Sequence, residues 1–375
     1  MTTDFPHSRP TIPFPAAEYR ARLERLRRRI AAQRFDAVLI EDAVNRLYFT
    51  GLDASNGVLC VCPDERRPLF LTDFRYLEEA RGQVGFARTG VLKGGRRYQP
   101  LAGPARRGRW RRVGYDGGGS LAALEQMKKA LPDVKEWASC QAAIDGLRAV
   151  KSPAEIGAIR AAVAAGDAVF AAALARIRPG MTEWAIRVLI RGLMDRFSQG
   201  EAFDTIVCAG ANASRCHHHP SRQRLRAGQE LLLDMGVRVD GYCSDLTRVV
   251  FFGPPSPKLR EIYRLVLEAN RRAIAGVRAG LTSHEADRLA RRVIARAGYG
   301  RRFGHGLGHS LGLQIHESVA LRPDGRQVLR PGMVLTIEPG IYLPGVGGVR
   351  IEDVVVIRRR GCEVLTAAPK RLQVL

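Results

Sequence analysis

Apolar and polar residues alternate with two different periods in the first part of the chain. Residues 16–33 carry apolar positions at helical spacing with Arg between them, which predicts a basic amphipathic helix. Residues 35–40 follow as a strand, and apolar segments at 57–62 and 68–71 alternate with further helical stretches. Residues 92–120 are rich in Gly and Arg and are expected to form loops. The pattern predicts an α/β domain over residues 14–145.

A second domain, predicted over residues 150–375, opens with a strong helix-start signal. Ser152 can cap the helix, Pro153 suits its first position, and Glu155 completes a capping box three residues after the cap. Apolar residues then recur at helical spacing until Pro179 and Gly180, where we expect the chain to leave the helix.

An internal repeat organises this second domain. Residues 177–182 are echoed 100 residues later by residues 277–282, and each copy precedes a helix whose N-cap would be Thr182 or Thr282. Each half then reaches a two-stranded segment that carries a pair of acids. The four acids are Asp234 and Asp245 in the first half, and Glu338 and Glu352 in the second. We expect an α+β domain whose two halves face each other across a pseudo-twofold axis and bring four carboxylates to one centre.

The first acidic pair lies on a predicted hairpin. Asp240 and Gly241 form a strong two-residue turn, which places Asp234 opposite Thr247 across the strands. Asp245 then lies on the same face, diagonal to Asp234 and within about 7–8 Å. Two carboxylates on an apolar strand pair repel each other unless a cation lies between them. The alternative is one acid at a solvated strand end and the other at an N-cap.

The second acidic pair presents the same difficulty. Glu338 ends the apolar run 334–337, and Glu352 interrupts the apolar run 349–357. A buried acid in such a run requires a partner, which would be a metal ion or Arg350 in a simple ion pair.

Histidine usage favours the metal. Three of the eight histidines, His305, His309 and His316, lie within residues 304–316 among four glycines. A segment this rich in glycine is a poor helix former. Because it lies between the two acidic hairpins, these histidines are better explained as metal ligands and substrate-binding groups. His217, His218 and His219 precede Asp234, and for His218 and His219 we expect a surface cluster. Four carboxylates and one imidazole suit two ions such as Mn²⁺, Co²⁺ or Zn²⁺.

Composition excludes several other classes of protein. The chain has 375 residues, 46% of them hydrophobic, and a net charge of +23 that comes from scattered Arg without a DNA-binding motif. Specific nucleic-acid binding is therefore not expected. No apolar run reaches the ~18–20 residues of a membrane span, and residues 1–6 lack a secretory signal. Seven widely spaced cysteines form no disulfide framework, so we expect a cytoplasmic protein.

These motifs, taken in order, resemble a known family over roughly residues 14–375. The chain is similar to the Xaa-Pro peptidases of the pita-bread metallopeptidase family, the group of aminopeptidase P and prolidase, with methionine aminopeptidase and creatinase as more distant relatives. The resemblance implies a creatinase/prolidase-like N-terminal domain and a pita-bread catalytic domain. The segments that carry it are FDAVLI, LYFTG and LTDFRYLEEA in the first domain, and VKSPAEI, RPGMTE, FDTIV, LLLDMG, GYCSDLTR, GHGLGHSLGLQIHE, IEPGIY and VRIED in the second.

The resemblance also implies a role for each candidate residue. The metal ligands would be Asp234, Asp245, His309, Glu338 and Glu352. A metal-activated water would attack the scissile carbonyl, Glu338 would shuttle the proton, and an imidazolium at His316 would stabilise the oxyanion. His217 matches the upstream catalytic histidine, while His305 would line the proline pocket and Arg350 would brace the site and help to bind substrate. The chain departs from its relatives at residues 218–220, where a small residue often follows the histidine.

The implied activity is removal of the first residue from peptides with proline in the second position. Residues 71–80 are more similar to aminopeptidase P than to prolidase, and a prolidase-type dipeptidase is the alternative. A metal-free creatinase-like hydrolase or a binding module with the same fold is a further alternative, which the intact ligands disfavour. The resemblance implies two divalent ions, most simply Mn²⁺ with Co²⁺ or Zn²⁺ as alternatives, proline-containing peptides as substrates, and a homodimer.

Overall fold

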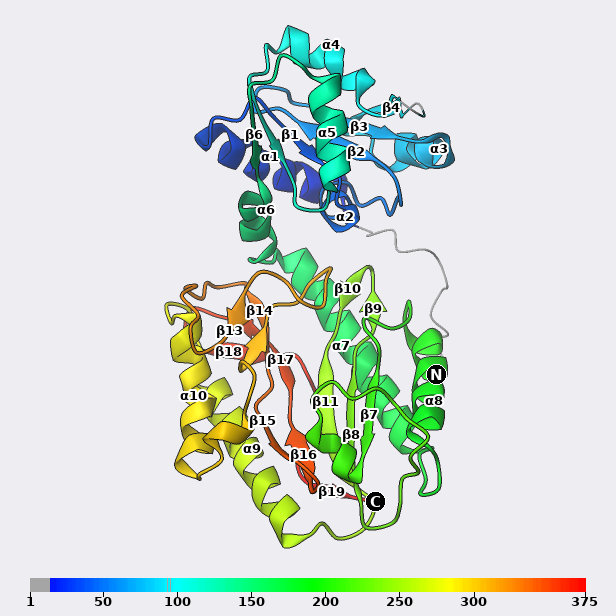
Figure 1. Ribbon diagram of the computed structural model, residues 1–375, viewed down its shortest axis with the longest axis vertical. Coiled ribbons are helices and arrows are strands. Elements are labelled where there is room, and N and C mark those ends of the chain that lie inside the picture. Colours follow the sequence, from blue (N-terminus) through cyan, green and yellow to red (C-terminus); the bar gives the residue numbers. More distant parts are fainter. Residues whose placement is uncertain (1–13, 93, 95) are drawn as a thin grey trace. The chain divides into compact units, whose positions relative to one another are not determined.

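The computed structural model describes residues 14–92, 94 and 96–375 (Figure 1). The chain divides into two compact units, one that ends at Arg148 and one from Ala149 to Leu375. The N-terminal residues 1–6, which prompted the prediction that a secretory signal is absent, lie outside the described residues.

The first unit is built on one six-stranded sheet with helices around it. The strand order is β4-β3-β2-β1-β5-β6, in which β1, β2 and β3 pair antiparallel and the other pairs are parallel. The strands are β1 (Ala37–Ile40), β2 (Val58–Val61), β3 (Leu69–Thr72), β4 (Arg88–Val91), β5 (Arg112–Tyr115) and β6 (Glu136–Ser139). The helices are α1 (Ala16–Ala32), α2 (Ala43–Thr50), α3 (Phe74–Gln83), α4 (Gln99–Arg107), α5 (Leu121–Ala130) and α6 (Gln141–Arg148). This architecture confirms the predicted α/β class.

The prediction that residues 92–120 form loops is wrong. Helix α4 and strand β5 lie within this segment, and Leu101 and Val113 are fully buried in the core of the unit. Strand β5 pairs parallel with β1, which is distant in the sequence. The many Gly and Arg residues hide this short strand, because its identity depends on its neighbour in the sheet.

The second unit contains two sheets and three short ribbons. One sheet has the order β19-β11-β8-β7 and the other β14-β17-β18, while the ribbons are β9-β10, β12-β13 and β15-β16. The strands are β7 (Ile206–Ala209), β8 (Glu230–Met235), β9 (Arg238–Val239), β10 (Tyr242–Cys243), β11 (Leu246–Phe251), β12 (Gly308–His309), β13 (Ala320–Leu321), β14 (Val334–Ile337), β15 (Gly340–Leu343), β16 (Gly347–Arg350), β17 (Asp353–Ile357), β18 (Cys362–Val364) and β19 (Gln373–Val374). The helices are α7 (Pro153–Leu174), α8 (Glu183–Phe197), α9 (Pro257–Gly276) and α10 (Ser283–Arg296), with 3₁₀ turns η1 (Gly210–Ser214) and η2 (Gly300–Arg302).

The internal repeat appears as two helix pairs on opposite sides of the strands. Helices α7 and α8 cover one side and α9 and α10 the other (Figure 1). Thr182 and Thr282 cap α8 and α10 with their side chains, as predicted, and Ser152 forms the predicted capping box at α7. The α+β class with its pseudo-twofold repeat is confirmed.

Helix α7 is long and apolar enough to cross a membrane by length and composition alone. Within the unit it packs against α8 and the β9-β10 ribbon, and 44% of its most apolar window is buried. Its Asp167 accepts hydrogen bonds from the Ala367 and Ala368 amides. These contacts are those of a core helix.

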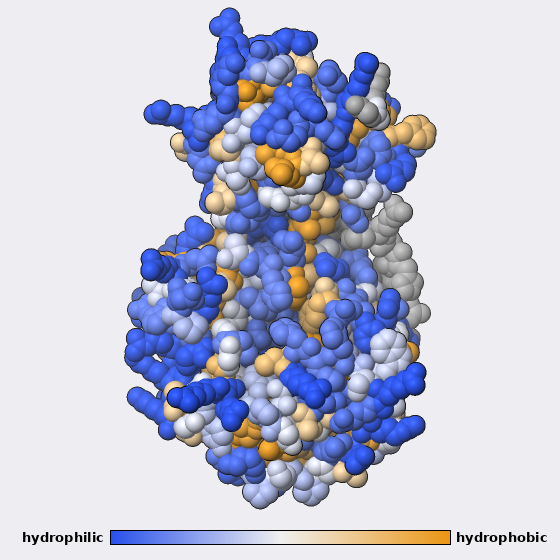
Figure 2. All heavy atoms as spheres, in the orientation of Figure 1, coloured by the Kyte–Doolittle hydropathy of each residue, from blue (hydrophilic) through white to orange (hydrophobic). Residues whose placement is uncertain are grey.

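Hydrophilic residues cover most of the face seen in Figure 2. Several Arg side chains pair with neighbouring acids, as Arg28 does with Glu24 and Arg272 with Glu268, one helical turn apart. Part of the positive charge inferred from composition is therefore locally balanced on the surface.

The capping threonines lead to a stability prediction. Replacing Thr282 with Ala removes the hydroxyl that accepts from the Glu285 amide, and should lower the free energy of unfolding by about 1 kcal/mol. For a domain of this size the midpoint of thermal unfolding should fall by about 2–4 °C. Thr282→Ser keeps the cap and should melt like the wild type; equal losses in both variants would contradict the assignment.

Candidate metal centre

The first acidic hairpin has the predicted register. Asp240 and Gly241 adopt φ values of 50° and 77°, as a tight hairpin turn requires. Thr247 on β11 lies opposite Asp234 on β8. Asp245 directly precedes β11, so both carboxylates belong to the same end of this strand pair.

The second acidic pair lies at an interruption in one long hairpin. Strands β14 and β17 are paired up to Ile337 and Asp353, and the separate β15-β16 ribbon begins with Gly340 opposite Arg350. Glu338 and Glu352 occupy the gaps between these two ladders. The register of both ladders, continued through the gap, places Glu338 opposite Glu352, so the two residues share one face of the hairpin.

The five predicted ligands come together. Ligand atoms of Asp245, His309 and Glu352 lie within 4.8 Å of one another. His309 Nε2 is 3.5 Å from Asp245 Oδ2 and 3.4 Å from Glu338 Oε1. Asp234 is near enough to raise the pKa values of Asp245, Glu338 and Glu352 by its charge.

The centre strongly disfavours negative charge in the absence of a cation. Burial, reinforced by the neighbouring carboxylates, raises the pKa values of Asp245 and Glu352 well above their usual range. Burial is also the main cause that raises the pKa of Glu338 to about 7. Three acids of this kind need a cation to remain ionised together at neutral pH.

Several side-chain atoms of the cluster could each bind a metal ion. Among the described residues, Asp234 Oδ1 and Glu352 Oε1 are buried without a hydrogen-bond partner. His309 Nδ1 lies 3.4 Å from the Ser310 carbonyl, to which it can donate, and this leaves the Nε2 lone pair facing the carboxylates. Burial lowers the pKa of His309 to about 3, which keeps it neutral as a ligand must be. The residues therefore fit a metal site.

Arg350 braces the centre, but it does not form the simple pair with Glu352 that we considered. Its guanidinium binds Asp234 and donates to Thr247 Oγ1 at 3.0 Å and to the Tyr342 hydroxyl at 2.9 Å. Glu352 instead accepts a hydrogen bond from Thr247 Oγ1 at 2.7 Å. Arg350 thus fixes one carboxylate directly and the other through Thr247, and its contact with substrate stays a prediction.

His305 lies at the end of the same chain of hydrogen bonds. Its Nδ1 faces the Gly306 carbonyl at 2.8 Å, so that nitrogen carries the proton and Nε2 accepts from the Tyr342 hydroxyl at 2.9 Å. Burial, with the charge of Arg350 next in importance, lowers the pKa of His305 to about 4. The His305 side chain is therefore neutral and half-buried, and it lies near the candidate metal centre.

His316 and His217 are exposed, unlike the ligands. The His316 ring packs edge-on against His309, with centroids 4.3 Å apart. Burial and the nearby His217 lower the pKa of His316, so the free protein favours a neutral imidazole there. The imidazolium inferred from the resemblance stays a prediction for the substrate complex.

Glu183, which we did not predict from the sequence, holds the segment that carries His217. This fully buried carboxylate accepts from the Ala209 amide at 2.8 Å, and further donors come from the η1 segment and the loop after it. These are Asn212 Nδ2, His218 Nε2, Ser221 N and Ser221 Oγ, at 2.9, 2.8, 2.9 and 2.6 Å. Burial opposes the charge of Glu183, but these hydrogen bonds outweigh it and lower its pKa. Glu183 follows the cap residue Thr182, so the sequence suggested only a helix start.

The expectation of a surface cluster is therefore wrong for His218, whose side chain is only 9% exposed and bound to Glu183. His219 is exposed, as expected. The difference arises because the acceptor for His218 is 35 residues earlier in the chain.

A buried ion pair holds the segment that carries His316. Lys151 Nζ donates to Glu317 Oε2 at 3.0 Å, and both side chains are almost fully buried. Lys151 directly precedes the α7 capping box, and Glu317 directly follows His316. The sequence shows both residues beside predicted features. It does not show that they pair with each other across 166 residues.

Comparisons with known proteins agree with this arrangement. Residues 157–359 match Metallopeptidase family M24, and residues 22–150 match the Creatinase/Prolidase N-terminal domain. The chain is 34% identical to an Xaa-Pro dipeptidase of Pyrococcus furiosus over 352 residues, which cover 94% of this chain and 99% of the relative.

Solved structures extend the likeness to the fold. The Xaa-Pro dipeptidase from Bacillus anthracis matches with a TM-score of 0.91 and 35% identity, covering 95% of this chain and 100% of its own. The X-Pro aminopeptidase from Thermotoga maritima matches with a TM-score of 0.87 and 33% identity, covering 94% and 100%. The predicted combination of a creatinase-like N-terminal domain with a pita-bread catalytic domain is confirmed.

The Glu183 cluster leads to a pH-dependent prediction. Glu183→Gln should lower stability by about 2 kcal/mol at neutral pH, because hydrogen bonds to a charged acceptor are weakened. The folded-state pKa lies below the usual 4.5, so this stabilisation is present above that pH and is lost as the pH falls below it. The difference in unfolding midpoint between wild type and variant should therefore narrow in acid. The proposed role of the charged Glu183 would be contradicted if this difference in unfolding midpoint did not change with pH. It would also be contradicted if the exposed control Glu268→Gln lowered the midpoint equally.

Metal binding can be tested without any substrate. Mn²⁺ added to chelator-treated protein should raise the thermal midpoint, with about 2.7 kcal/mol of stabilisation when the free ion is about 100 times its Kd. Asp245→Asn should abolish most of the increase, whereas Asp324→Asn, an exposed acid in the same unit, should leave it intact. An increase that survives in Asp245→Asn would place the ion elsewhere.

Proposed function

The chain belongs to metallopeptidase family M24, and on this premise we propose that it hydrolyses the Xaa-Pro bond at the N-terminus of peptides. The observation that carries the proposal is the cluster of the five predicted ligand residues, which includes unpartnered buried oxygens and lies beside two exposed histidines. The full-length likeness to enzymes named as Xaa-Pro dipeptidase and X-Pro aminopeptidase supports the choice of substrate.

The proposed ligands are Asp234, Asp245, His309, Glu338 and Glu352. Two divalent cations held by them, most simply Mn²⁺ with Co²⁺ or Zn²⁺ as alternatives, would lower the pKa of a water and polarise the peptide carbonyl. Glu338 would take the proton of the attacking water and return it to the leaving proline nitrogen. Thr336 Oγ1 donates to Glu338 Oε1 at 3.1 Å and so limits the orientations of that carboxylate.

His316 and His217 would act on the substrate from the open side of the centre. Both imidazoles are exposed and therefore reachable by a peptide. A proton on His316 would stabilise the negative charge that develops on the carbonyl oxygen. Glu183 and the Lys151–Glu317 pair would keep the two segments in position.

A proline in the second position lacks an N–H and has a fixed φ. His305 and Tyr342 present a neutral ring and a hydroxyl already used in hydrogen bonds. We propose that they form part of the wall against which the proline ring packs, as the resemblance implies for His305.

Aminopeptidase action is our first proposal and dipeptidase action the second. A dipeptidase requires a free basic group for the substrate carboxylate, and Arg350 already gives its donors to Asp234, Thr247 and Tyr342. The names of the dipeptidase relatives favour the second alternative. The lengths of cleaved peptides decide between them.

The cytoplasmic location and the homodimer expected from the sequence are also proposals. The seven cysteines are all unbridged, which suits a reducing compartment. Light scattering of the purified chain tests the dimer.

Substrate preference should follow peptide length and the second residue. With Mn²⁺ restored, we expect cleavage of Ala-Pro-Ala, little cleavage of Ala-Pro, and much slower cleavage of Ala-Ala-Ala. Turnover of Ala-Pro alone would establish the dipeptidase. Equal rates on Ala-Pro-Ala and Ala-Ala-Ala would remove the proline pocket, and a lack of metal-dependent cleavage would favour the creatinase-like alternative.

The role of His316 can be separated from metal binding. His316→Ala should lower kcat by roughly 10²–10³-fold, as the loss of one oxyanion donor does, while Mn²⁺ affinity changes little. His219→Ala, an exposed histidine on the other loop, should keep wild-type kcat. Full activity in His316→Ala would rule out its proposed role.

A further inference from the structure

A buried polar layer lies directly behind the two glutamates of the metal centre. Its central residue is Asn270 on α9, which is fully buried. Asn270 Nδ2 donates to the Ile337 carbonyl at 3.0 Å and to the Ile351 carbonyl at 3.3 Å. Ile337 and Ile351 are the residues immediately before Glu338 and Glu352. A single side-chain amide thus joins the two backbone segments from which these carboxylates project.

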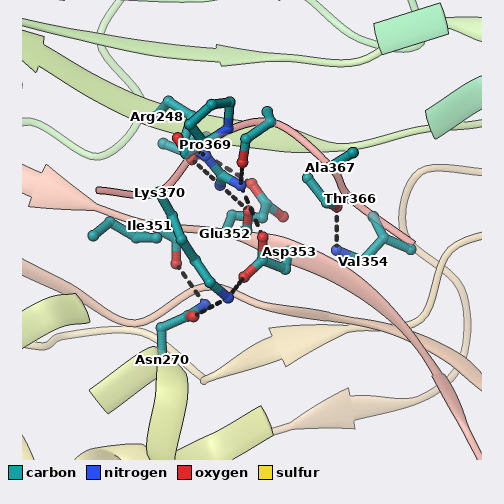
Figure 3. Close-up of polar contacts among 12 residues, drawn as sticks. Arg248, Asn270, Ile351, Glu352, Asp353, Val354, Thr366, Ala367, Pro369 and Lys370 are labelled. Atoms are coloured by element: carbon teal, nitrogen blue, oxygen red, sulfur yellow. Dashed lines mark hydrogen bonds and ion pairs between the residues drawn. The ribbon is translucent and has the colours of Figure 1, made fainter. Parts of the chain in front are cut away.

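The other atom of the Asn270 amide is held by the C-terminal segment. Lys370 Nζ donates to Asn270 Oδ1 at 2.9 Å and to Asp353 Oδ2 at 2.6 Å. Asp353 directly follows Glu352 in the chain. Figure 3 shows the Lys370 side chain extending between Asn270 and Asp353, so the C-terminal segment locks the amide in one orientation.

Arg248 completes the layer from the other half of the domain. Its Nη2 donates to Asp353 Oδ1 and to the Ala368 carbonyl, both at 2.8 Å, and its Nη1 donates to the Glu352 carbonyl. Arg248 directly follows Thr247, whose hydroxyl binds the Glu352 carboxylate. Adjacent residues of β11 therefore hold Glu352 by its backbone and by its side chain. Figure 3 shows Arg248 beside Glu352 and Asp353.

Stability alone does not explain this layer, because burying charged groups costs free energy. Buried ions lose their hydration, and apolar side chains of similar volume are often at least as stabilising. Both hydrogen bonds that Asn270 donates, and bonds from Lys370 and Arg248, end on the residues that precede, form or follow the two proposed ligands. Carboxylates that repel one another move apart unless their backbone is fixed, and outer groups commonly supply that restraint at metal sites.

We propose that Asn270 and Lys370 are positioning residues that set the separation and orientation of Glu338 and Glu352 for metal binding. The C-terminal segment 366–371 thereby becomes part of the metal site although it supplies no ligand. The inference rests on the proposed function only in taking this centre as the metal site. It concerns affinity for the ion and does not depend on which peptide is cleaved.

The test measures binding of Mn²⁺ alone, by competition with a chromophoric chelator. Asn270→Ala should raise the Kd by roughly 10–100-fold, the usual effect of removing an outer-shell group. Val266→Ala is the matched control, since this residue is equally buried on the same helix one turn earlier and packs only in the apolar core. It should lower the thermal midpoint without changing the Kd. Wild-type affinity in Asn270→Ala, or an equal loss in Val266→Ala, would overturn the proposal.

A second pair of variants covers the case in which Asn270→Ala does not fold. Lys370 is partly exposed, with 26% of its side chain accessible, so Lys370→Met should be tolerated. It should weaken Mn²⁺ binding several-fold, whereas Lys370→Arg, which can still donate to both partners, should bind close to wild type. Equal Mn²⁺ affinity in Lys370→Met and the wild type would overturn the proposed positioning role of Lys370.

Hydrolysis of Ala-Pro-Ala provides the readout that distinguishes positioning from general damage. Activity of Lys370→Met should rise toward the wild-type kcat as Mn²⁺ is increased, with KM little changed. A kcat that stays low at saturating Mn²⁺ would overturn the inference. If the wild type binds Mn²⁺ but cleaves no proline peptide, the proposed function fails while the affinity comparison still decides this inference.

Discussion

Four carboxylates and one imidazole lie close together in the second unit, and the repulsion among the carboxylates is the constraint on which the catalytic domain depends. Burial raises the pKa values of Asp245, Glu338 and Glu352, and neighbouring carboxylates raise them further, whereas the charge of Arg350 lowers them. Only cations allow these groups to remain ionised together. Much of the surrounding structure can be understood as the means of keeping the acids together until a cation binds.

The two halves of the domain meet this constraint in different ways. The first half places Asp234 within a paired strand and uses Arg350 from the second half to balance it. The second half places Glu338 and Glu352 in breaks between ladders, where the backbone is less regular and requires support from behind. Arg248, from the first half, supports Glu352 of the second half. Asn270, from the second half, joins the two segments of its own half that carry Glu338 and Glu352.

The groups proposed to meet the substrate lie on a different kind of backbone. His217 and His316 are exposed on irregular segments, where access is easy but position is poorly defined by secondary structure. Each segment is anchored by a buried charge close to the histidine, Glu183 in one case and the Lys151–Glu317 pair in the other. Buried ions thus give exposed residues the precision that catalysis requires.

The sequence by itself determined the features that depend on neighbouring residues. The caps at Ser152, Thr182 and Thr282 and the turn at Asp240 follow from local hydrogen bonding and φ preference, and the turn then sets Asp234 opposite Thr247. The motifs around the acids and His309 were likewise readable as a metal site. Only the tertiary structure decided that β5 is a strand, that His218 binds Glu183, and that Asn270 and Lys370 lie behind the glutamates. Glu183 lies 35 residues before His218 and Asn270 lies 100 residues before Lys370, and the pattern within one segment does not specify which distant segment will pack against it.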